Sequence, residues 1–258
     1  LAESEDGIHW EIPDLSDRVD LSERFVPHQV MDATRFREWC GVHFDKRAAG
    51  TDQAFKGMVS YSREDGSPYG SEAVLAASAD GINWRYDESI HWSPEGVDPG
   101  YYAFWNPYRN THVITLRPSN ADRRVAVTET SDWRNFSKPE LMLEADALDT
   151  PCALIYGMPV FLYDQMFVAL IWVFHTDPIV SDDDKFLSGN LDARRGDDMA
   201  RVMGKIDCQL GYSRNGWHFQ RTVRDTFIAN TQPGEHGSGC IYPSSLIVDG
   251  DVIKIYSS

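Results

Sequence analysis

Residues 78–84 read Ser-Ala-Asp-Gly-Ile-Asn-Trp, and this motif decides the fold because it recurs along the chain. Its pattern is a small hydroxyl residue, any residue, Asp or Asn, usually Gly, two further residues, and then Trp or Phe. The other copies are Ser4–Trp10, Thr130–Phe136 and Ser213–Phe219. Fixed internal spacing that returns along a chain indicates a repeat architecture.

Each copy of the motif is typical of a turn between strands. Apolar, alternating runs precede three of the copies, at residues 73–77, 125–128 and 208–212. Such runs, closed by a turn cluster, predict strands. Gly adopts a positive φ without steric cost, and an Asp or Asn side chain accepts hydrogen bonds from backbone amides two residues on. The final aromatic is expected to return the chain into the hydrophobic layer between sheets, so we interpret the motif as fold-forming rather than functional.

Four more pairs of apolar runs, each joined by a short turn segment, predict further strand pairs. They lie at 40–44 with 55–61, 102–105 with 112–116, 159–163 with 167–174, and 245–248 with 252–256. Combined with the motif, they give a repeating unit of four antiparallel strands, and radial repetition of that unit makes a β-propeller. The stretch 186–203 is the only plausible helix, and it is short and polar.

The expected fold class is all-β, a five-bladed β-propeller of four-stranded antiparallel blades that is incomplete at both ends. A single propeller domain is expected over residues 1–258. Its full blades fall at about 30–95, 100–143 and 153–224, with partial blades at 1–20 and 239–258. The two partial blades could instead pair and close a four-bladed ring. The chain lacks an initiator Met, and we expect a longer protein whose missing ends complete a fifth blade.

The charge balance argues against two classes of partner. The formal net charge is −16 and the sequence pI is about 4.8. Nucleic acids and anionic membranes both require basic patches, so neither is expected as a partner. No apolar stretch reaches the roughly 20 residues that a membrane helix needs. Eight Trp, eleven Tyr and twelve Phe supply rings for packing between blades and for stacking on the apolar faces of sugars.

The cysteines do not indicate a metal site. Cys40, Cys152, Cys208 and Cys240 show no Cys-x-x-Cys spacing, which argues against structural zinc. Their isolation and apolar neighbours predict buried free thiols, and a disulfide stays open if the protein is exported. The acidic segment 182–198 lacks the spacing of an EF-hand loop, so the sequence leaves the presence of a metal unknown.

Three segments carry a family resemblance, at residues 104–107, 156–161 and 239–245. With the repeated motif they resemble the five-bladed β-propeller glycoside hydrolase superfamily, which includes families 32 and 43. The resemblance is more specific to a bacterial group described as family 32-like or sialidase-like glycosyl hydrolases, and it runs over nearly the whole chain. That group usually carries Asp where this chain has Asn106. Loss of a catalytic Asp would impair activity, whereas Asn replaces Asp well as a turn cap.

The resemblance implies hydrolysis of a glycosidic bond in an oligosaccharide or polysaccharide. It implies no required cofactor, and a structural calcium ion by analogy only. The expected partner is a carbohydrate, and neither nucleic acid nor membrane, while the oligomeric state stays open. Analogy favours a secreted or periplasmic location. The alternative is a non-catalytic carbohydrate-binding propeller, because fold alone does not imply function, and a second alternative is a scaffold for protein partners.

The resemblance also implies a place for the site, because that superfamily carries three carboxylates at the channel mouth where the first strand of each blade begins. One carboxyl must be protonated to release the leaving oxygen, and another must be ionised to attack the sugar or activate water. A third can hold their pKa values apart. The acidic residues that precede the expected inner strands are Asp98, Asp149, Glu235, Glu38 and Asp32. None lies in a sharp catalytic motif, and each could instead be a solvated loop charge.

Candidate substrate-binding residues lie near the same strands. They are Trp105, Tyr156, Met158, His175, His236 and Tyr242. The alternative for the aromatic residues and Met158 is packing, and for His175 a structural role. Arg37, Arg117 and Arg123–Arg124 fit recognition of an acidic sugar or, more simply, pairing with nearby carboxylates. The charged connection 176–205 is either a lid or subunit contact, or a solvated excursion.

Overall fold

The structure, a computed structural model, describes residues 1–19, 26–31, 36–61, 72–92, 101–117, 123–177, 203–221 and 223–257. Internal contacts divide the chain into two compact units. The first unit comprises Leu1–Pro118 and Thr128–Pro139, and the second comprises Ser119–Val127 and Glu140–Ser258. The predicted single propeller domain and its blade boundaries stay a prediction.

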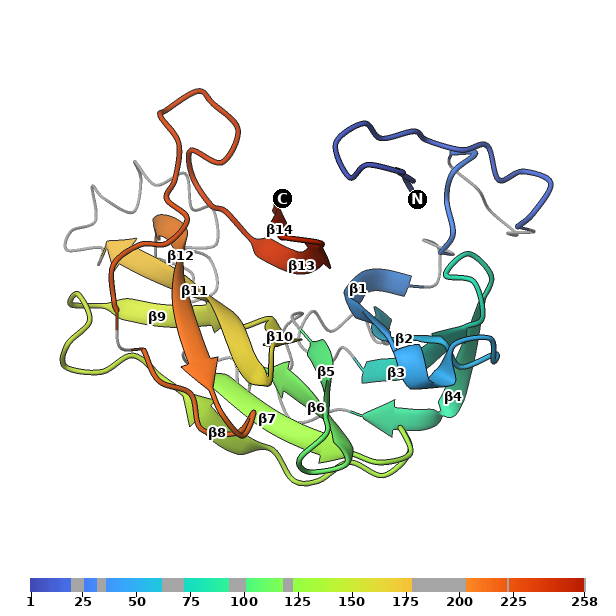
Figure 1. The fold of residues 1–258 in the computed structure, drawn as a ribbon, viewed down its shortest axis with the longest axis horizontal. Coiled ribbons are helices and arrows are strands. Elements are labelled where there is room, and N and C mark those ends of the chain that lie inside the picture. Colours follow the sequence, from blue (N-terminus) through green and yellow to red (C-terminus); the bar gives the residue numbers. More distant parts are fainter. Residues whose placement is uncertain are drawn as a thin grey trace, which may run out of the picture. The chain divides into compact units, whose positions relative to one another are not determined.

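Four strands near the N-terminus form an antiparallel sheet in chain order (Figure 1). They are β1 (Phe36–Phe44), β2 (Phe55–Tyr61), β3 (Glu72–Ser78) and β4 (Trp84–Trp92). Val59, Val74 and Ala76 form a core with no solvent exposure, and Trp84 packs against it. The apolar runs that predicted β2 and β3 therefore supply the interior of this sheet. A single 3-10 turn, Lys46–Ala48, follows β1.

Two further sheets have four strands each, and the last has two. The second sheet has the order β5 (Tyr102–Asn106), β6 (Thr111–Leu116), β7 (Val125–Thr130) and β8 (Glu140–Leu143). In the third sheet β10 (Val160–Tyr163), β11 (Met166–Asp177) and β12 (Met203–Ser213) are neighbours, and β9 (Ala153–Gly157) also pairs with β11. The last sheet pairs β13 (Pro243–Asp249) with β14 (Val252–Ser257). The predicted unit of four antiparallel strands is confirmed, while the number of blades stays a prediction.

The repeated motif forms the same hydrogen bonds in every copy. In the second copy, the amides of Ile82 and Asn83 donate to Asp80 Oδ1 at 2.9 and 2.8 Å, and the Gly81 amide donates to Ser78 Oγ at 3.0 Å. The equivalent bonds recur in the first, third and fourth copies. The Asp or Asn therefore builds the turn, as predicted.

Trp133 occupies the position that is Gly in the other three copies. Its φ is 58°, in the left-handed region where Gly7, Gly81 and Gly216 have φ of 73°, 75° and 68°. A bulky residue with positive φ is strained, and the surrounding structure must hold it there. Trp133 is only 3% exposed, so its packing and hydrogen bonding provide that restraint.

Two details of the motif differ from expectation. Trp10 is 52% exposed rather than buried, because its copy borders only an isolated bridge between Glu3 and Glu11 within the described residues. After the fourth copy, the described chain makes two isolated antiparallel bridges to β12, Tyr212 with Gln220 and Cys208 with Ile228, instead of a full strand. Between these bridges, Arg221 is buried and donates to Asp149.

Two predictions fall on other parts of the third sheet. The strand predicted at 159–163 is β10, and a separate strand, β9, precedes it and ends at Gly157. The predicted helix 186–203 lies outside the described residues apart from Met203, which opens β12. Across the described chain, no helix has the length and apolar character that crossing a bilayer requires.

Candidate functional site

The third sheet ends in a group of polar side chains at the point where β9 begins. Ala153, the first residue of β9, lies opposite His175 near the end of β11, and His175 lies opposite Lys205 near the start of β12. Residues 146–152 lead into β9 and so reach the same end of the sheet. This is the end at which an inner strand begins, where the sequence predicts the site.

Asp149 is held at this end by two arginines. Arg221 donates from Nη1 to Asp149 Oδ2 at 2.9 Å and from Nη2 to Oδ1 at 2.5 Å. The two side chains are only 2% and 3% exposed. Arg224 Nη1 lies 3.1 Å from Asp149 Oδ1, and the amide of Asp146 donates to Oδ2 at 2.9 Å. Asp149 is therefore a fixed carboxylate in a two-point ion pair with Arg221.

The protonation of Asp149 follows from these contacts. Burial acts to raise the pKa of Asp149, but the hydrogen bonds from Arg221 and the Asp146 amide, with the charges of Arg221 and Arg224, hold it below its ordinary value. The carboxylate is thus ionised at neutral pH. Since both oxygens are bound by arginine, it suits a fixed charge better than a proton donor or a nucleophile.

His175 and Asp207 form a second ion pair beside Asp149. His175 Nε2 lies 3.0 Å from Asp207 Oδ1, with the side chains 36% and 12% exposed. Asp207 Oδ2 accepts a hydrogen bond from Thr226 Oγ1 at 2.7 Å, and His175 Nδ1 lies 3.3 Å from the Thr150 hydroxyl. The contact with Asp207 raises the pKa of His175 above its ordinary value, against burial, which lowers it.

A pocket of about 260 Å³ opens over these groups. Its lining is Leu148, Asp149, Thr150, Val173, His175, Gln209, Arg224, Asp225 and Thr226, all in the second unit. We use the name Asp149 pocket for this cavity together with Asp207 and Arg221, which bind its lining residues. Carboxylate, imidazole, guanidinium and hydroxyl groups thus meet in one open pocket, a lining that suits a polar ligand.

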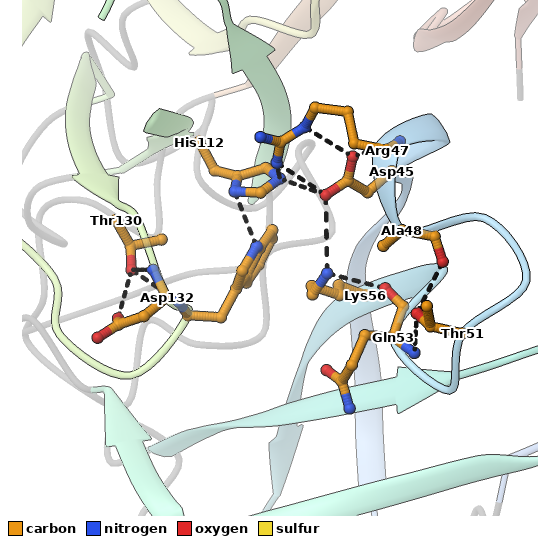
Figure 2. Close-up of polar contacts among 10 residues, drawn as sticks. Asp45, Arg47, Ala48, Thr51, Gln53, Lys56, His112, Thr130 and Asp132 are labelled. Carbon is orange, nitrogen blue, oxygen red and sulfur yellow. Dashed lines mark hydrogen bonds and ion pairs between the residues drawn. The ribbon is translucent and has the colours of Figure 1, made fainter. Parts of the chain in front are cut away.

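The first unit contains another buried polar group, drawn in Figure 2. Asp45 Oδ2 accepts a hydrogen bond from Arg47 Nη2 at 2.9 Å and lies 3.1 Å from His112 Nε2. Lys56 Nζ is 3.9 Å from the same oxygen (Figure 2). On the other side of the imidazole, Trp133 Nε1 donates to His112 Nδ1 at 3.0 Å. We use the name His112 cluster for His43, Asp45, Arg47, Lys56, His112 and Trp133.

The His112 cluster has ligand atoms at metal-binding spacing, but its hydrogen bonds oppose a metal. Ligand atoms of His43, Asp45 and His112 lie within 4.8 Å of one another. An indole N–H only donates, so His112 Nδ1 must accept, and the neutral ring then carries its proton on Nε2, toward Asp45. Arg47 already binds both Asp45 oxygens. We therefore interpret the cluster as structural.

The pKa values of the cluster indicate neutral histidine rings. Burial, followed by the neighbouring His43, lowers the pKa of His112 to about 4. Burial also lowers the pKa of His43 to about 4. Both rings are therefore neutral at pH 7, and the ionised Asp45 provides the acceptor for the protonated Nε2 of His112.

The structure describes the side chains of some of the predicted catalytic carboxylates and not of others. Asp98 and Asp32 lie outside the described residues, as does the side chain of Glu38 in β1. Glu235 lies in an exposed loop, where its Oε2 accepts from the Gln232 amide at 3.1 Å, and it does not line the Asp149 pocket. Asp149 is thus the predicted carboxylate that reaches a pocket in the described chain.

Three of the predicted binding residues do not line the Asp149 pocket. Trp105 lies under the Arg47 guanidinium, whose carbon is 3.1 Å from the ring centroid, at cation–π distance. Met158 is 1% exposed and belongs to the hydrophobic core. His236 is exposed, and its carbonyl accepts from Thr231 Oγ1 at 2.6 Å.

The remaining predicted binding residues lie in the second unit. His175 lines the Asp149 pocket. The half-buried rings of Tyr156 and Tyr242 are 5.8 Å apart, and the Arg123 guanidinium lies 5.5 Å from the Tyr156 ring. Arg124 pairs with Glu144 at 3.0 Å, as the simpler interpretation of the arginines predicts.

Asn106 caps a turn, which explains the departure from the Asp of the resembled group. Its Oδ1 accepts from the amides of Tyr108 and Arg109 at 3.1 and 3.3 Å, and the residue is fully buried. An Asp would accept the same two bonds. The family's usual Asp is therefore replaced here by a residue that keeps the turn.

The predicted burial of the cysteines is confirmed for Cys208 and wrong for Cys152. Cys208 is buried and Cys240 is half-buried, whereas Cys152 is exposed, and all three are free thiols. Cys152 has φ of 65° in the turn before β9, which directs this segment toward solvent. The side chain of Cys40 lies outside the described residues.

Sequence reasoning missed Asp207, Arg221 and Arg224 as parts of the pocket. A signal for Asp207 was present in β12, where Lys205, Asp207 and Gln209 alternate with apolar residues. Asp207 and Gln209 are nevertheless 8% and 5% exposed, so the polar side of this strand is buried too. Buried polar residues on a strand require partners, and their presence indicates a site or a network.

No protein-family model matches the chain, and no curated protein sequence matches it. Solved structures match its fold. An N-acetylgalactosamine deacetylase from F. plautii, in complex with blood group B trisaccharide, has a TM-score of 0.62 and 14% identity, covering 99% of this chain and 70% of its own. A thermostable family-43 glycoside hydrolase has a TM-score of 0.50 and 10% identity, covering 83% and 72%.

A third structure, described as a glycoside hydrolase, has a TM-score of 0.50 and 12% identity, covering 79% of this chain and 58% of its own. The chain therefore spans less than two thirds of that protein's length. These identities support conclusions about the fold alone. Repeated four-stranded antiparallel sheets and these matches agree: the chain has an all-β propeller fold.

Proposed function

We propose that the chain is a glycoside hydrolase that binds a carbohydrate in the Asp149 pocket. One observation carries the proposal: the pocket lies at the end of the sheet where β9 begins, and it is lined by ionisable and hydroxyl groups. Sugars present many hydroxyls, which such groups bind by hydrogen bonds. The net charge of −16 favours a neutral or cationic ligand over a polyanionic one.

The catalytic acids would come from the predicted carboxylates other than Asp149. Asp149 serves instead as the fixed charge that orients Arg221 and Arg224 in the pocket, because both of its oxygens are bound. Asp98, Glu38, Asp32 and Glu235 then stay the candidates for proton donor and nucleophile or base. Glycoside hydrolysis requires two such carboxyl groups, about 5–5.5 Å apart for retention and wider for inversion.

Carbohydrate deacetylation is a second candidate function. The structure with a TM-score of 0.62 is a deacetylase acting on N-acetylgalactosamine, not a glycoside hydrolase. A non-catalytic carbohydrate-binding propeller is a third, since the Asp149 pocket could bind a sugar without cleaving it. The three functions differ in their products, so one assay distinguishes them.

The test is a product assay on a panel of oligosaccharides and N-acetylated sugars, measuring reducing ends and acetate separately. Glycoside hydrolysis predicts new reducing ends, deacetylation predicts acetate, and a binding module gives a calorimetric binding signal with neither product. Single amide variants Asp98→Asn, Glu38→Gln and Glu235→Gln then locate the acids. Loss of a general acid lowers kcat by roughly 10²–10⁴-fold. Full turnover in all three variants would contradict the carboxylate assignment.

Asp251→Asn is the matched control for the amide variants. Asp251 is an exposed residue in the turn between β13 and β14, so its loss of charge is expected to leave turnover and melting temperature unchanged. A loss of turnover in this control would show that the assay reports general charge effects rather than the site.

A further inference from the structure

The Asp149 pocket contains a histidine arranged for proton transfer. His175 Nε2 faces Asp207 Oδ1 at 3.0 Å, and Asp207 Oδ2 is fixed from the other side by Thr226 Oγ1 at 2.7 Å. A carboxylate that binds one ring nitrogen sets the tautomer and the orientation of an imidazole. The other nitrogen, Nδ1, lies 3.3 Å from the hydroxyl of Thr150, and both residues line the pocket.

The surroundings of Nδ1 leave room for a ligand oxygen. Its neighbour is the hydroxyl of Thr150 at 3.3 Å, on an exposed residue that also lines the pocket. A sugar oxygen that took the place of this hydroxyl would lie within hydrogen-bond distance of His175 Nδ1. His175 itself is about one third exposed, so a ligand in the pocket reaches it directly.

We propose that His175 is a catalytic acid of the Asp149 pocket and that Asp207 is its positioning residue. This inference rests on the proposed function and assigns its proton donor to His175, so that a predicted carboxylate supplies the base. In the step, the Nδ1–H of the imidazolium passes its proton to the leaving glycosidic oxygen. The bond from the anomeric carbon to that oxygen breaks and leaves its electron pair on the oxygen. Water adds to the anomeric carbon and loses a proton to a carboxylate base, and solvent restores both protonation states.

The charges that face His175 favour the protonated ring. Asp207 and the exposed Lys205 come from β12, and Asp149 comes from the segment before β9. Arg224 and Asp225 come from the segment after Arg221. Asp207 and Asp149 raise the pKa of His175. A raised pKa favours the protonated ring, which is the form that a general acid needs.

The test compares His175→Gln and Asp207→Asn with the control His218→Gln. His218 is an exposed histidine in the fourth motif, outside the pocket. The catalytic role predicts a kcat loss of roughly 10²–10⁴-fold for His175→Gln. The wild-type rate should fall as pH rises through the pKa of His175, and this limb should be absent in His175→Gln. Asp207→Asn should move the limb to lower pH and lower kcat more than it changes KM.

Two further measurements separate a catalytic role from a structural one. Free imidazole should restore part of the turnover of His175→Ala, which a purely structural defect would not allow. The NMR titration of the His175 ring should give a lower pKa in Asp207→Asn than in the wild type, whether or not a substrate is known. Thr226→Val, which removes the hydrogen bond to Asp207, should lower the pKa of His175 by a smaller amount. This variant keeps the test available if Asp207→Asn fails to fold.

The outcomes distinguish this inference from the proposed function. Sugar cleavage that His175→Gln leaves unchanged in rate and pH profile would overturn the role of His175 and keep the proposed function. A wild type that cleaves no glycosidic bond would overturn the proposed function and the acid role together. An unchanged His175 titration in Asp207→Asn would overturn the positioning role of Asp207 even if cleavage were observed.

Discussion

The His112 cluster and the Asp149 pocket contain the same chemical groups in opposite arrangements. Each has a buried Asp bound by an arginine and a histidine close to a carboxylate. In the His112 cluster, the Trp133 indole occupies Nδ1 of His112 and Asp45 faces Nε2. In the Asp149 pocket, Asp207 faces one nitrogen of His175, and the other lies 3.3 Å from the exposed Thr150 hydroxyl.

This difference explains why similar residues suit different roles. A histidine with both nitrogens engaged by protein groups has no site for a ligand and contributes to the packing of its unit. A histidine with one nitrogen held by a carboxylate and the other toward a pocket can exchange protons with a ligand. Changes in the His112 cluster should therefore act on stability, and changes in the Asp149 pocket should act on function as well.

Replacing Arg221 with Met should have the largest effect on stability. The change leaves the buried Asp149 charge with Arg224 as its remaining arginine partner. Breaking one side of a buried ion pair costs about 3–5 kcal/mol, because the remaining charge is left without compensation. Urea unfolding followed by circular dichroism measures the loss.

Arg85→Met is the matched control, because Arg85 and Asp52 also pair at 2.5 Å but are 63% and 61% exposed. Water and salt replace that pair at little cost, so the control should unfold close to the wild type. Equal destabilisation of the two variants would show that burial does not set the contribution of the Asp149 pair.

Acidification should destabilise the first unit through His43 and His112. Their pKa values are about 4 in the folded chain and about 6.5 in an unfolded one, so between these pH values the unfolded chain binds more protons. Stability therefore falls as pH drops from 6.5 toward 4, by about 2–3 kcal/mol for each of the two groups. Urea unfolding at a series of pH values measures this slope.

His43→Phe should flatten that slope, because it removes one titrating ring while keeping an aromatic against Trp133. The exposed His9 provides a control, His9→Gln, with the slope unchanged. His175 has the opposite sign, since its folded pKa is raised. Its contribution is fully present below the unfolded pKa and is lost as pH rises through the folded value. A first unit that gains stability on acidification would contradict the assignment of neutral, buried histidines.

Trp133→Phe should cost about 1 kcal/mol, less than either change above. It keeps most of the ring and the strained backbone but removes the indole donor, which leaves Nδ1 of the buried His112 unpaired. Trp84→Phe is the control, because the Trp84 indole donates to the Gly81 carbonyl in a turn that water reaches more easily. Thermal unfolding compares them, and a larger loss in Trp84→Phe would argue against a shared network around His112.

The sequence was sufficient for the strands because their determinants are local. The Ser78–Trp84 motif specifies its own turn through Asp80, and β2 was predicted at 55–61 as it is observed. Local rules also gave Asn106 as a turn cap. The exposure of Cys152 was missed because it depends on the left-handed turn before β9.

The site could be predicted only in part, because its contacts join distant residues. Asp149 was located from the position of the inner strand, but its partner Arg221 lies 72 residues further along the chain. That pairing joins the residue two positions after the fourth motif to the segment before β9, and no local pattern indicates it. The strained backbone of Trp133 could not be predicted either, because tertiary contacts such as the hydrogen bond to His112 stabilise its positive φ.

Added zinc or nickel should have the smallest effect, a shift in melting temperature below about 1 °C. A metal that bound the His112 cluster would have to displace the proton on His112 Nε2 and approach Asp45 beside the Arg47 and Lys56 cations. Both steps oppose binding. The control is Arg47→Gln, which removes one cation and frees the two Asp45 oxygens that Arg47 binds, and which should respond to metal more than the wild type. A large stabilisation of the wild type by metal, absent in His112→Gln, would contradict the structural role of the His112 cluster. The cluster would then be a ligand site rather than a closed network.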